Sequence, residues 1–533
     1  MSSNNEVQVR EHWSGSLGFV LAAAGSAIGL GNIWKFPYIA GENGGGAFVL
    51  IYLVCIFAVG LPVMLCEISI GRNTQKNPVG AYKMLQPRVS TLGHVIGFFM
   101  LLIGVSLVFF ESYGFAALFS IIGILIFIYG WTVAGFIGVL AGFVILSFYS
   151  VVGGWTIGYI GLAVSGSINY TSPTLGGDLF SYITKSPMEM IFFHVCFMII
   201  CALIIVKGVQ KGIERWSKIL MPVLFLLLVV LILRGVTLDT NNAGIKFFLT
   251  PDFSKLTTKA VLIALGHAFF TLSLGMGAMI TYGSYISKQQ NLFVSSLAIV
   301  ALDTLIAIMG GLAIFPAVFA MGFAPDKGPG LVFNVLPVVF NGIPGGVAIW
   351  GTMFFVLLLI AAVTSGISLL EVVVAYFVDE LKIKRIYAVL IATVSITLLG
   401  VLCAVSIANW ENLQPLHKVL VGAFNIKQDS LFEVMDNLAT NWLLPLGGLA
   451  CSIFVGWIWG TNKAVEEIRH GSNNFADVHL IALLAGLKDD PSHSNSEYHV
   501  LTLAAVWGIF IRFITPVLVT IAFLYTVGWI SIK

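Results

Sequence analysis

Long apolar runs recur along the whole chain, and they limit it to the folds that a lipid bilayer permits. A run of 18 or more apolar residues is long enough to cross a hydrocarbon core about 30 Å thick. The chain is also 58% hydrophobic and only 10% charged, whereas a soluble domain carries roughly 25% charged residues. We therefore predict an all-α integral membrane protein embedded in the lipid bilayer. Eleven spans are expected, near residues 14–40, 45–71, 133–163, 188–207, 212–235, 258–287, 292–322, 344–378, 387–409, 434–459 and 498–530.

Lysine and arginine cluster in alternate loops, and this pattern predicts the orientation of the chain. Cytoplasmic loops carry an excess of these cations. The pattern therefore places the N-terminus, with Arg10, in the cytoplasm, and an odd number of spans leaves the C-terminus outside. The clusters are Arg72, Lys76, Lys83 and Arg88, then Lys207, Lys211, Arg215 and Lys218, then Lys382, Lys384 and Arg385.

The apolar stretch at residues 93–131 belongs to neither neighbouring span. The preceding span ends inside at Arg72, and the following span must also start inside. The inserted stretch must then cross the membrane twice or not at all. We predict a helical hairpin, either fully spanning or dipping partway, with its polar tip at residues 111–114.

Glycine-rich interruptions in the first and sixth spans predict two broken helices. The first interruption is GSAIGLGN at residues 25–32, and the second is FTLSLGMG at residues 270–277. Broken spans in matching positions are typical of an inverted repeat with a binding site near the membrane midplane. The alternative is close helix packing through small residues. We expect a single transporter domain over residues 1–533, with five-helix repeats at about 10–235 and 256–460 and an extra helix at about 498–530.

The chain shows few signs of the other common functional classes. Its net charge of +2 does not indicate a nucleic-acid partner, and its cysteines lie inside apolar runs without a metal or redox spacing. The motifs HExxH and GxSxG and a phosphate-binding loop are absent from the sequence. We therefore do not expect an enzyme.

Several long stretches make the chain resemble the neurotransmitter:sodium symporter family. The resemblance implies a LeuT-like fold of five plus five inverted helices, and the single span after the tenth is similar to the eleven-helix bacterial members. It also implies sodium-coupled amino-acid symport, in a monomer or weak homo-oligomer. The stretches are REHW at 10–13, GSAIGLGNIWKFPYIAGENGGGAFVLIY at 25–52, EISIGR at 67–72, ILSFYSVVGGWT at 145–156, KGIERWSKILMP at 211–222, FFTLSLGMGAMITYGSY at 269–285, AAVTSGISLLE at 361–371 and FVDEL at 377–381.

The resemblance implies two sodium sites beside the broken helices. The ligands of one are expected to be Ala27, Asn32, Thr271 and Asp303, completed by the carboxylate of the substrate. Those of the other are expected to be Gly25, Ile28, Ala361, Thr364 and Ser365. Without the resemblance, hydroxyls in an apolar helix are usually bonded to their own backbone.

The resemblance also implies a substrate pocket between the two breaks. Relatives that carry amines have Asp where this chain has Gly29, so a substrate that brings its own carboxylate is expected. Because the pocket is mostly apolar, we expect a hydrophobic or aromatic amino acid. The predicted substrate-binding residues are Ser26, Ala27, Gly29, Leu30, Gly31, Ile145, Tyr149, Phe270, Thr271, Ser273, Met276, Ser365 and Leu369.

Asp303 departs from the Asn that is more frequent in the family. A fixed carboxylate there can balance the sodium charges, so we expect transport without chloride. His267 replaces a Gln of the family. We expect it to be a neutral histidine that is hydrogen-bonded to Tyr52 or Asp303.

The resemblance further implies a gate on each side of the pocket. On the outer side, Lys35 is expected to pair with Asp436, more weakly than the Arg usual in the family, because lysine binds a carboxylate as a point charge. On the cytoplasmic side, Arg10 is expected to pair with Asp379, with Trp13 and Tyr285 packed around them. Two other interpretations stay open: an amino-acid receptor on a transporter fold, and a symporter of another carboxylate osmolyte.

Overall fold

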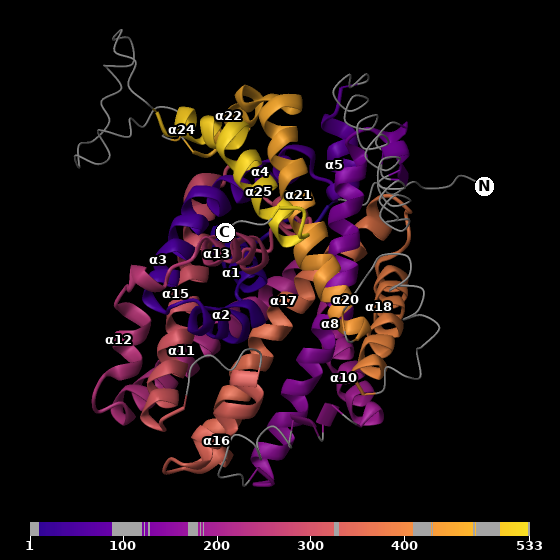
Figure 1. Cartoon of the computed structure of the whole chain (residues 1–533). Helices are drawn as coiled ribbons and strands as arrows, with labels where there is room; N and C mark the ends of the chain where they lie inside the picture. The colour runs from indigo at the N-terminus through magenta and orange to yellow at the C-terminus, as the bar shows by residue number, and fades with distance from the viewer. Residues whose placement is uncertain are drawn as a thin grey trace.

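The computed structural model is all-helical, and nine of its helices are long and apolar enough to cross a membrane among the residues that it describes (Figure 1). The pair Ser16–Ala27 and Gly31–Glu42, bent by 48°, forms a tenth span. The residues described are 10–87, 120–121, 123–125, 128–168, 180–181, 183–184, 186–323, 330–408, 428, 430–472, 475 and 502–530. The predicted hairpin tip at residues 111–114 and most of the insert at 93–131 lie outside them.

The nine spans agree with predicted spans to within a few residues at most of their ends. In lipid, the backbone N–H and C=O groups of a helix must be hydrogen-bonded within the helix itself. The length of each spanning helix therefore follows the length of its apolar run. The nine are Gly46–Thr74, Thr132–Val164, Pro187–Ile205, Val209–Leu238, Leu292–Ala320, Val347–Asp379, Arg385–Ala408, Leu431–Arg469 and Leu503–Thr526.

Both predicted breaks are present in the first and sixth spans. Helix α1 (Ser16–Ala27) ends at Ile28, whose backbone is extended, and the π-helical turn η1 (Gly31–Lys35) continues into α2 (Phe36–Glu42). Helices α13 (Thr258–Thr271) and α14 (Ala278–Gly283) stand in place of one continuous sixth span. Between them, Gly275 and Gly277 have φ of 78° and 73°, a region that glycine adopts without steric cost.

Two long buried helices form the framework around these breaks. Helix α8 (Thr132–Val164) packs along α17 (Thr352–Asp379), and α1 contacts both α17 and α15 (Leu292–Ala320). Ile145 and Tyr149 on α8 and Leu369 on α17 are buried and face the region of the breaks. The broken helices are therefore enclosed by continuous ones.

The remaining elements complete the bundle. They are α3 (Gly46–Cys55), η2 (Ile56–Gly60), α4 (Leu61–Thr74), α5 (Pro78–Leu85), α10 (Pro187–Ile205), η3 (Val209–Glu214), α11 (Arg215–Leu238), α12 (Ala243–Leu249), η4 (Phe253–Lys255), η5 (Leu331–Val335), α16 (Leu336–Asn341), η6 (Val347–Gly351), α18 (Arg385–Ala408), α20 (Leu431–Asn437), η8 (Leu438–Leu443), α21 (Leu444–Ile453), η9 (Phe454–Gly460), α22 (Thr461–Arg469), α24 (Leu503–Ile509), η11 (Phe510–Ile514) and α25 (Thr515–Thr526).

Short helices mark the two ends of the molecule. In Figure 1, α5 and α22 lie at one end, and α12 and α16 lie at the opposite end. These four helices were not among the predicted spans, because each is too short or too polar to give a membrane-spanning signal. Helix α22 is the end of the long helix Leu431–Arg469. This helix therefore runs to Arg469, whereas the predicted span ended at residue 459.

A buried ion pair attaches α22 to the rest of the bundle at that end. The guanidinium of Arg72, which is fully buried on α4, donates to the Glu467 carboxylate on α22 at 2.7 Å. Lys288, from the loop after α14, donates to the same carboxylate at 2.6 Å. Polar partners from two segments, α4 and the loop after α14, therefore explain why the charged end of this helix is folded against the bundle.

Candidate functional site

A small cavity lies between the two helix breaks. Its volume is about 20 Å³, which is close to the minimum that holds one water molecule. Every predicted substrate-binding residue except Leu30 lines it. The lining residues are Ser26, Ala27, Gly29, Gly31, Ile145, Tyr149, Phe270, Thr271, Ser273, Met276, Ser365 and Leu369.

A side chain at the position of Gly29 would require the Ser365 and Tyr149 side chains to move. A Cβ atom there would overlap the Ser365 hydroxyl and lie 2.9 Å from the Tyr149 hydroxyl oxygen. Leu30, which was expected to act through its backbone N–H, lines a separate cavity of about 240 Å³. Its backbone N–H, however, donates to the Tyr149 hydroxyl at 3.1 Å. Leu30 therefore reaches the site through its main chain.

Asp303 is the centre of a cluster of polar groups beside the first break. Its carboxylate is fully buried. The Asn32 side-chain amide donates to it at 2.8 Å and the Thr271 hydroxyl donates to it at 3.1 Å. The side-chain carbonyl oxygen of Asn32 in turn accepts a hydrogen bond from the backbone N–H of Gly29 at 3.1 Å. Three of the four residues predicted for one sodium site, Asn32, Thr271 and Asp303, are thus adjacent in space, although they come from η1, α13 and α15.

A second group of oxygen atoms lies where α17 passes α1. The Thr364 hydroxyl is 3.0 Å from the Ala361 carbonyl oxygen and 3.4 Å from that of Ile28. The Ser365 hydroxyl is 3.4 Å from the carbonyl oxygens of both Gly25 and Ile28. The end of α1 leaves the carbonyls of Gly25 and Ile28 without helical partners, and the hydroxyls of Thr364 and Ser365 lie beside them. The Ala361 carbonyl belongs to the interior of α17 and meets this group through Thr364.

His267 does not form the hydrogen bond that the sequence led us to expect. Neither of its ring nitrogens has a hydrogen-bond partner among the described residues. Its ring stacks on Phe36, with the ring centroids 5.8 Å apart, and the Tyr52 hydroxyl donates to Asp303 instead, at 3.4 Å. The prediction is wrong because Tyr52 and Asp303, the two expected partners, are hydrogen-bonded to each other.

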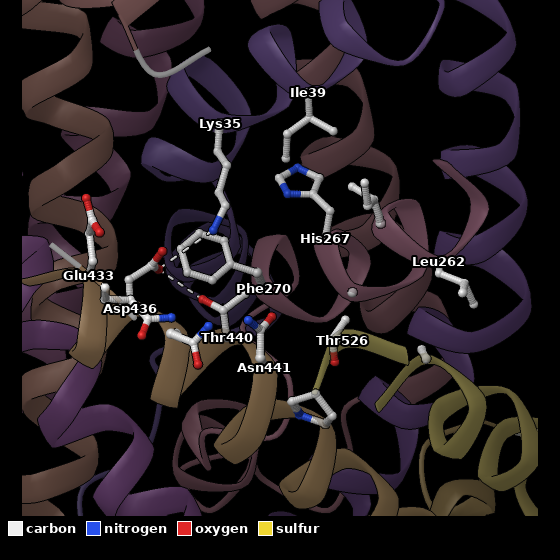
Figure 2. Close-up of a pocket in the computed structure, with 16 residues that line it drawn as sticks. Lys35, Ile39, Leu262, His267, Phe270, Glu433, Asp436, Thr440, Asn441 and Thr526 are labelled. Atoms are coloured by element: carbon white, nitrogen blue, oxygen red, sulfur yellow. Dashed lines mark hydrogen bonds and ion pairs between the residues drawn. The ribbon is translucent and has the colours of Figure 1, made fainter. Parts of the chain in front are cut away.

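Lys35 and Asp436 face each other on the α12–α16 side of the small cavity. The Lys35 ammonium is 3.8 Å from the Asp436 carboxylate and 4.6 Å from the centre of the Phe270 ring. Figure 2 shows these three side chains together, with Thr440 donating to the same carboxylate at 3.0 Å. A cavity of about 290 Å³ lies beside them. The long separation of the charges agrees with the looser contact expected of lysine.

A tighter set of contacts closes the α5–α22 side. Arg10 donates to the Asp379 carboxylate and to the Ser284 hydroxyl, both at 2.6 Å, and its guanidinium lies over the Tyr285 ring. The Trp13 indole N–H donates to the Tyr282 carbonyl at 3.0 Å. The small cavity is thus enclosed by charged and aromatic side chains on both sides.

Sequence reasoning missed two members of this second closure. The Glu371 carboxylate, fully buried on α17, accepts from the Tyr285 hydroxyl at 2.7 Å and from Arg385 at 2.6 Å. A carboxylate in an apolar span was the available signal for it. Ser284 carried no such signal, because a serine in an apolar helix is usually bonded to its own backbone.

The two oxygen clusters have the chemistry of sites for a hard cation. Carbonyl, hydroxyl and carboxylate oxygens are the ligands that such ions prefer. Within the described part of the chain there is no group of three or more His, Cys, Asp and Glu side chains that could hold a metal ion. The clusters therefore differ from the nitrogen and sulfur sites that zinc or copper favours.

Comparisons with known proteins agree with this architecture. The family model described as "Sodium:neurotransmitter symporter family" matches residues 10–132 and 181–482. An uncharacterized sodium-dependent transporter of Bacillus subtilis, YhdH, is 37% identical over 100% of both chains. An uncharacterized sodium-dependent transporter of Haemophilus influenzae is 32% identical over 98% of this chain and 99% of the other.

A solved structure is similar over nearly the whole chain. It is the crystal structure of MhsT in complex with L-phenylalanine, with a TM-score of 0.75 and 38% identity over 97% of this chain and 100% of that one. The fold, the spans and the family model together identify a multi-pass membrane protein that is a sodium-dependent transporter and not an enzyme. The chain belongs to the sodium:neurotransmitter symporter family.

Proposed function

We propose that this protein imports a hydrophobic or aromatic α-amino acid together with sodium, by alternating access. The observation that carries the proposal is the enclosed cavity between two broken helices, where main-chain polar groups and apolar side chains meet. The complex of MhsT with L-phenylalanine supports the same class of substrate. Because the cavity is only about 20 Å³, substrate binding requires Met276 and the unwound segment after α13 to move.

The polarity of the first break favours a zwitterionic substrate. The backbone N–H groups of Leu30 and Gly31 lie at the start of η1, where a helix attracts an anion. The Tyr149 hydroxyl, 3.1 Å from the Leu30 nitrogen, is a second donor for a carboxylate. The carbonyl oxygens of Ala27, Phe270 and Thr271, with Ser273 nearby, are the proposed acceptors for the ammonium group. Because Gly29 carries no carboxylate, we propose that the substrate supplies the carboxylate at this position.

Sodium is proposed to bind as a co-substrate in the two oxygen clusters. Oxygens held 2.3–2.6 Å from an ion, at right angles to one another, are separated by about 3.3–3.7 Å. Three of the contacts made by Thr364 and Ser365 measure 3.4 Å, a spacing that fits ligands around such an ion. In the structure the same two hydroxyls donate to the carbonyl oxygens of Ser26 and Ala361, at 2.9 Å and 3.0 Å. Ala27, Asn32, Thr271 and Asp303 are the proposed ligands of the other ion.

We further propose that transport needs no chloride. Two sodium ions place two positive charges beside a substrate whose own ammonium and carboxylate charges cancel. The buried carboxylate of Asp303 supplies the fixed negative charge that a bound chloride would otherwise provide.

The two closures described above are the proposed gates. Lys35 and Asp436, with Phe270 and Tyr149, close the side that the loop charges assign to the outside, and Arg10 and Asp379 close the cytoplasmic side. Residues 10–235 and 256–460 are the proposed inverted repeats, each opening on a broken helix, with the N-terminus inside and the C-terminus outside. Separation of one closure at a time would expose the cavity to each side in turn.

Uptake into proteoliposomes tests this function. Labelled amino acids are supplied with and without an inward sodium gradient, in chloride and in gluconate. We expect sodium-driven accumulation of hydrophobic or aromatic amino acids in both anions. Binding without accumulation would favour a receptor, and accumulation that requires chloride would contradict the role of Asp303.

A matched pair of serine variants separates the sodium site from general effects. Ser365→Ala removes a proposed ligand, and we expect the half-saturating sodium concentration to rise at least about tenfold, or 1.4 kcal/mol. Ser395→Ala removes a hydroxyl that bonds to Ile391 in its own helix, and uptake should match that of the wild type. Equal sodium dependence of the two variants would contradict the proposed site.

A further inference from the structure

The last described span contains one charged side chain that the transport mechanism does not use. Arg512 is the only charged residue between Leu503 and Thr526. Within the described residues it forms no ion pair, and its buried Nε atom has no hydrogen-bond partner. A cation in an apolar span is energetically costly and marks a functional site by default. We therefore expect Arg512 to bind an anion.

The guanidinium of Arg512 opens into a groove between two helices. The groove has a volume of about 650 Å³ and lies between one face of α22 and one face of α24 and η11. Small residues on the second face, Ala504, Ala505 and Gly508, keep it wide. The residues that line it are Thr461, Asn462, Val465, Glu466, Arg469, Ala504, Ala505, Gly508, Ile509, Arg512 and Phe513.

Two aromatic side chains flank the same guanidinium. Its central carbon lies 4.6 Å from the centre of the Trp457 ring and 5.5 Å from that of Phe513. Trp457 and Phe513 are 48% and 50% exposed, and the Trp457 indole N–H donates to the Arg512 carbonyl at 3.1 Å. Exposed tryptophan beside arginine is typical of the boundary between lipid tails and headgroups.

The groove is at the periphery of the bundle, where lipid surrounds the protein. Only 33% of the span Leu503–Thr526 is buried within the molecule. One wall of the groove carries exposed apolar side chains, Ile509 and Phe513, and α22 carries the polar residues Asn462, Glu466 and Arg469. This combination of an apolar wall and a polar rim matches a molecule with an acyl chain and a charged head.

We propose that this groove binds an anionic phospholipid, with Arg512 holding its phosphate. Arg512 forms no ion pair within the described residues, so its charge is available to a bound anion. Basic pockets between transmembrane helices on the cytoplasmic side recognise lipid headgroups in this way. The acyl chains then lie along Ile509 and Phe513, where a soluble phosphate has nothing to contact.

Lipid-dependent thermal unfolding of the purified full-length chain tests the proposal. Phosphatidylglycerol is titrated against phosphatidylcholine with the same acyl chains, and the midpoint of unfolding is followed. We expect phosphatidylglycerol to raise the midpoint of the wild type more than phosphatidylcholine does. Arg512→Gln should weaken the apparent affinity for phosphatidylglycerol about fivefold, the equivalent of about 1 kcal/mol for one basic side chain.

Arg234 provides a matched control. It lies over Trp350, at 5.6 Å, and its Nε also has no hydrogen-bond partner among the described residues. Since Arg234 does not line this groove, Arg234→Gln should keep the full preference for phosphatidylglycerol. An equal loss in both variants would overturn the proposal.

Two further experiments test the proposal even if Arg512→Gln folds poorly. Ala505→Phe fills the groove while leaving Arg512 in place, and it should also abolish the preference for phosphatidylglycerol. Inorganic phosphate alone should leave the midpoint unchanged. A shift with phosphate as large as that with phosphatidylglycerol would identify a soluble-anion site and overturn the lipid assignment, as would an unchanged lipid preference in Ala505→Phe.

Discussion

The proposed ion requirement of the site depends on a single side chain, Asp303. It is fully buried, and its carboxylate accepts hydrogen bonds from Asn32, Thr271 and Tyr52. A buried carboxylate without compensation is costly, and three donors offset only part of that cost. A bound cation would offset the rest, which is the role proposed for sodium.

Replacement of this carboxylate by an amide is expected to weaken sodium binding. Asp303→Asn keeps the size of the side chain but removes its charge, and the half-saturating sodium concentration for uptake should rise at least about tenfold. Added chloride should restore part of the loss. The measurement is a sodium titration of initial uptake rates in chloride and in gluconate.

Asp239→Asn is the control for this experiment. Asp239 is also buried, but it accepts the N–H groups of Ala243 and Gly244 at the start of α12. Its sodium titration should overlay that of the wild type. An Asp303→Asn titration that also overlays the wild type would exclude Asp303 as a sodium ligand.

At the scale of elements, the break between α13 and α14 depends on tight backbone packing. Gly275 has φ of 78°, and its N–H donates to the Glu67 carboxylate on α4 at 2.7 Å. A Cβ atom at this position would overlap the Leu444 carbonyl oxygen on α21 and lie 3.1 Å from the Gly448 nitrogen. The unwound segment is therefore held between α4 and α21 by contacts that only glycine permits.

Gly275→Ala is expected to destabilise the protein. The left-handed conformation costs a residue with a side chain roughly 1–2 kcal/mol, and the overlap with Leu444 adds to this cost. Gly266→Ala is the control, because that position in α13 has no atom within 4 Å of a new Cβ. Alanine in a helix interior stabilises by roughly 0.5–1 kcal/mol relative to glycine. Thermal unfolding in detergent should show opposite shifts, and a neutral Gly275→Ala would contradict this account.

At the scale of the whole molecule, the buried pair of Arg72 and Glu467 joins segments that are 395 residues apart. Arg72 also donates to the backbone carbonyls of Gln290 and His470, at 2.8 Å and 2.9 Å. The guanidinium thus connects α4, the loop after α14 and the end of α22. This network fixes one end of the bundle beside the Arg10–Asp379 closure.

Loss of the Glu467 charge is expected to cost much of this stability. Glu467→Gln leaves the Arg72 guanidinium buried without its carboxylate, a change that typically costs about 3–5 kcal/mol. The thermal unfolding midpoint should fall clearly, even with sodium present. In the control, Asp252→Asn removes the half-exposed partner of Lys255, and the midpoint should not change. Comparable midpoints for the two variants would show that the Arg72 network contributes little.

Most of the framework could be predicted from the sequence, because its signals are local. Apolar runs determine where helices cross lipid, and this predicted nine long helices closely and placed both breaks at their glycines. The predicted span at 434–459 is shorter than the helix Leu431–Arg469, because the α22 end of that helix is charged. Arg72 and Lys288 stabilise this charged end by pairing with Glu467. Hydropathy contains no information about such distant partners.

The features of the candidate site also fall into two groups, those that the sequence determined and those that depend on the tertiary structure. By itself, the sequence determined that the chain spans a membrane and breaks its first and sixth spans, and its motifs identified the residues that line the small cavity. Only the tertiary structure decided that Phe36 stacks on His267, that Lys35 stays 3.8 Å from Asp436, and that Arg512 opens into a groove. These features depend on distances between side chains from separate helices, and such distances arise from packing rather than from any local pattern.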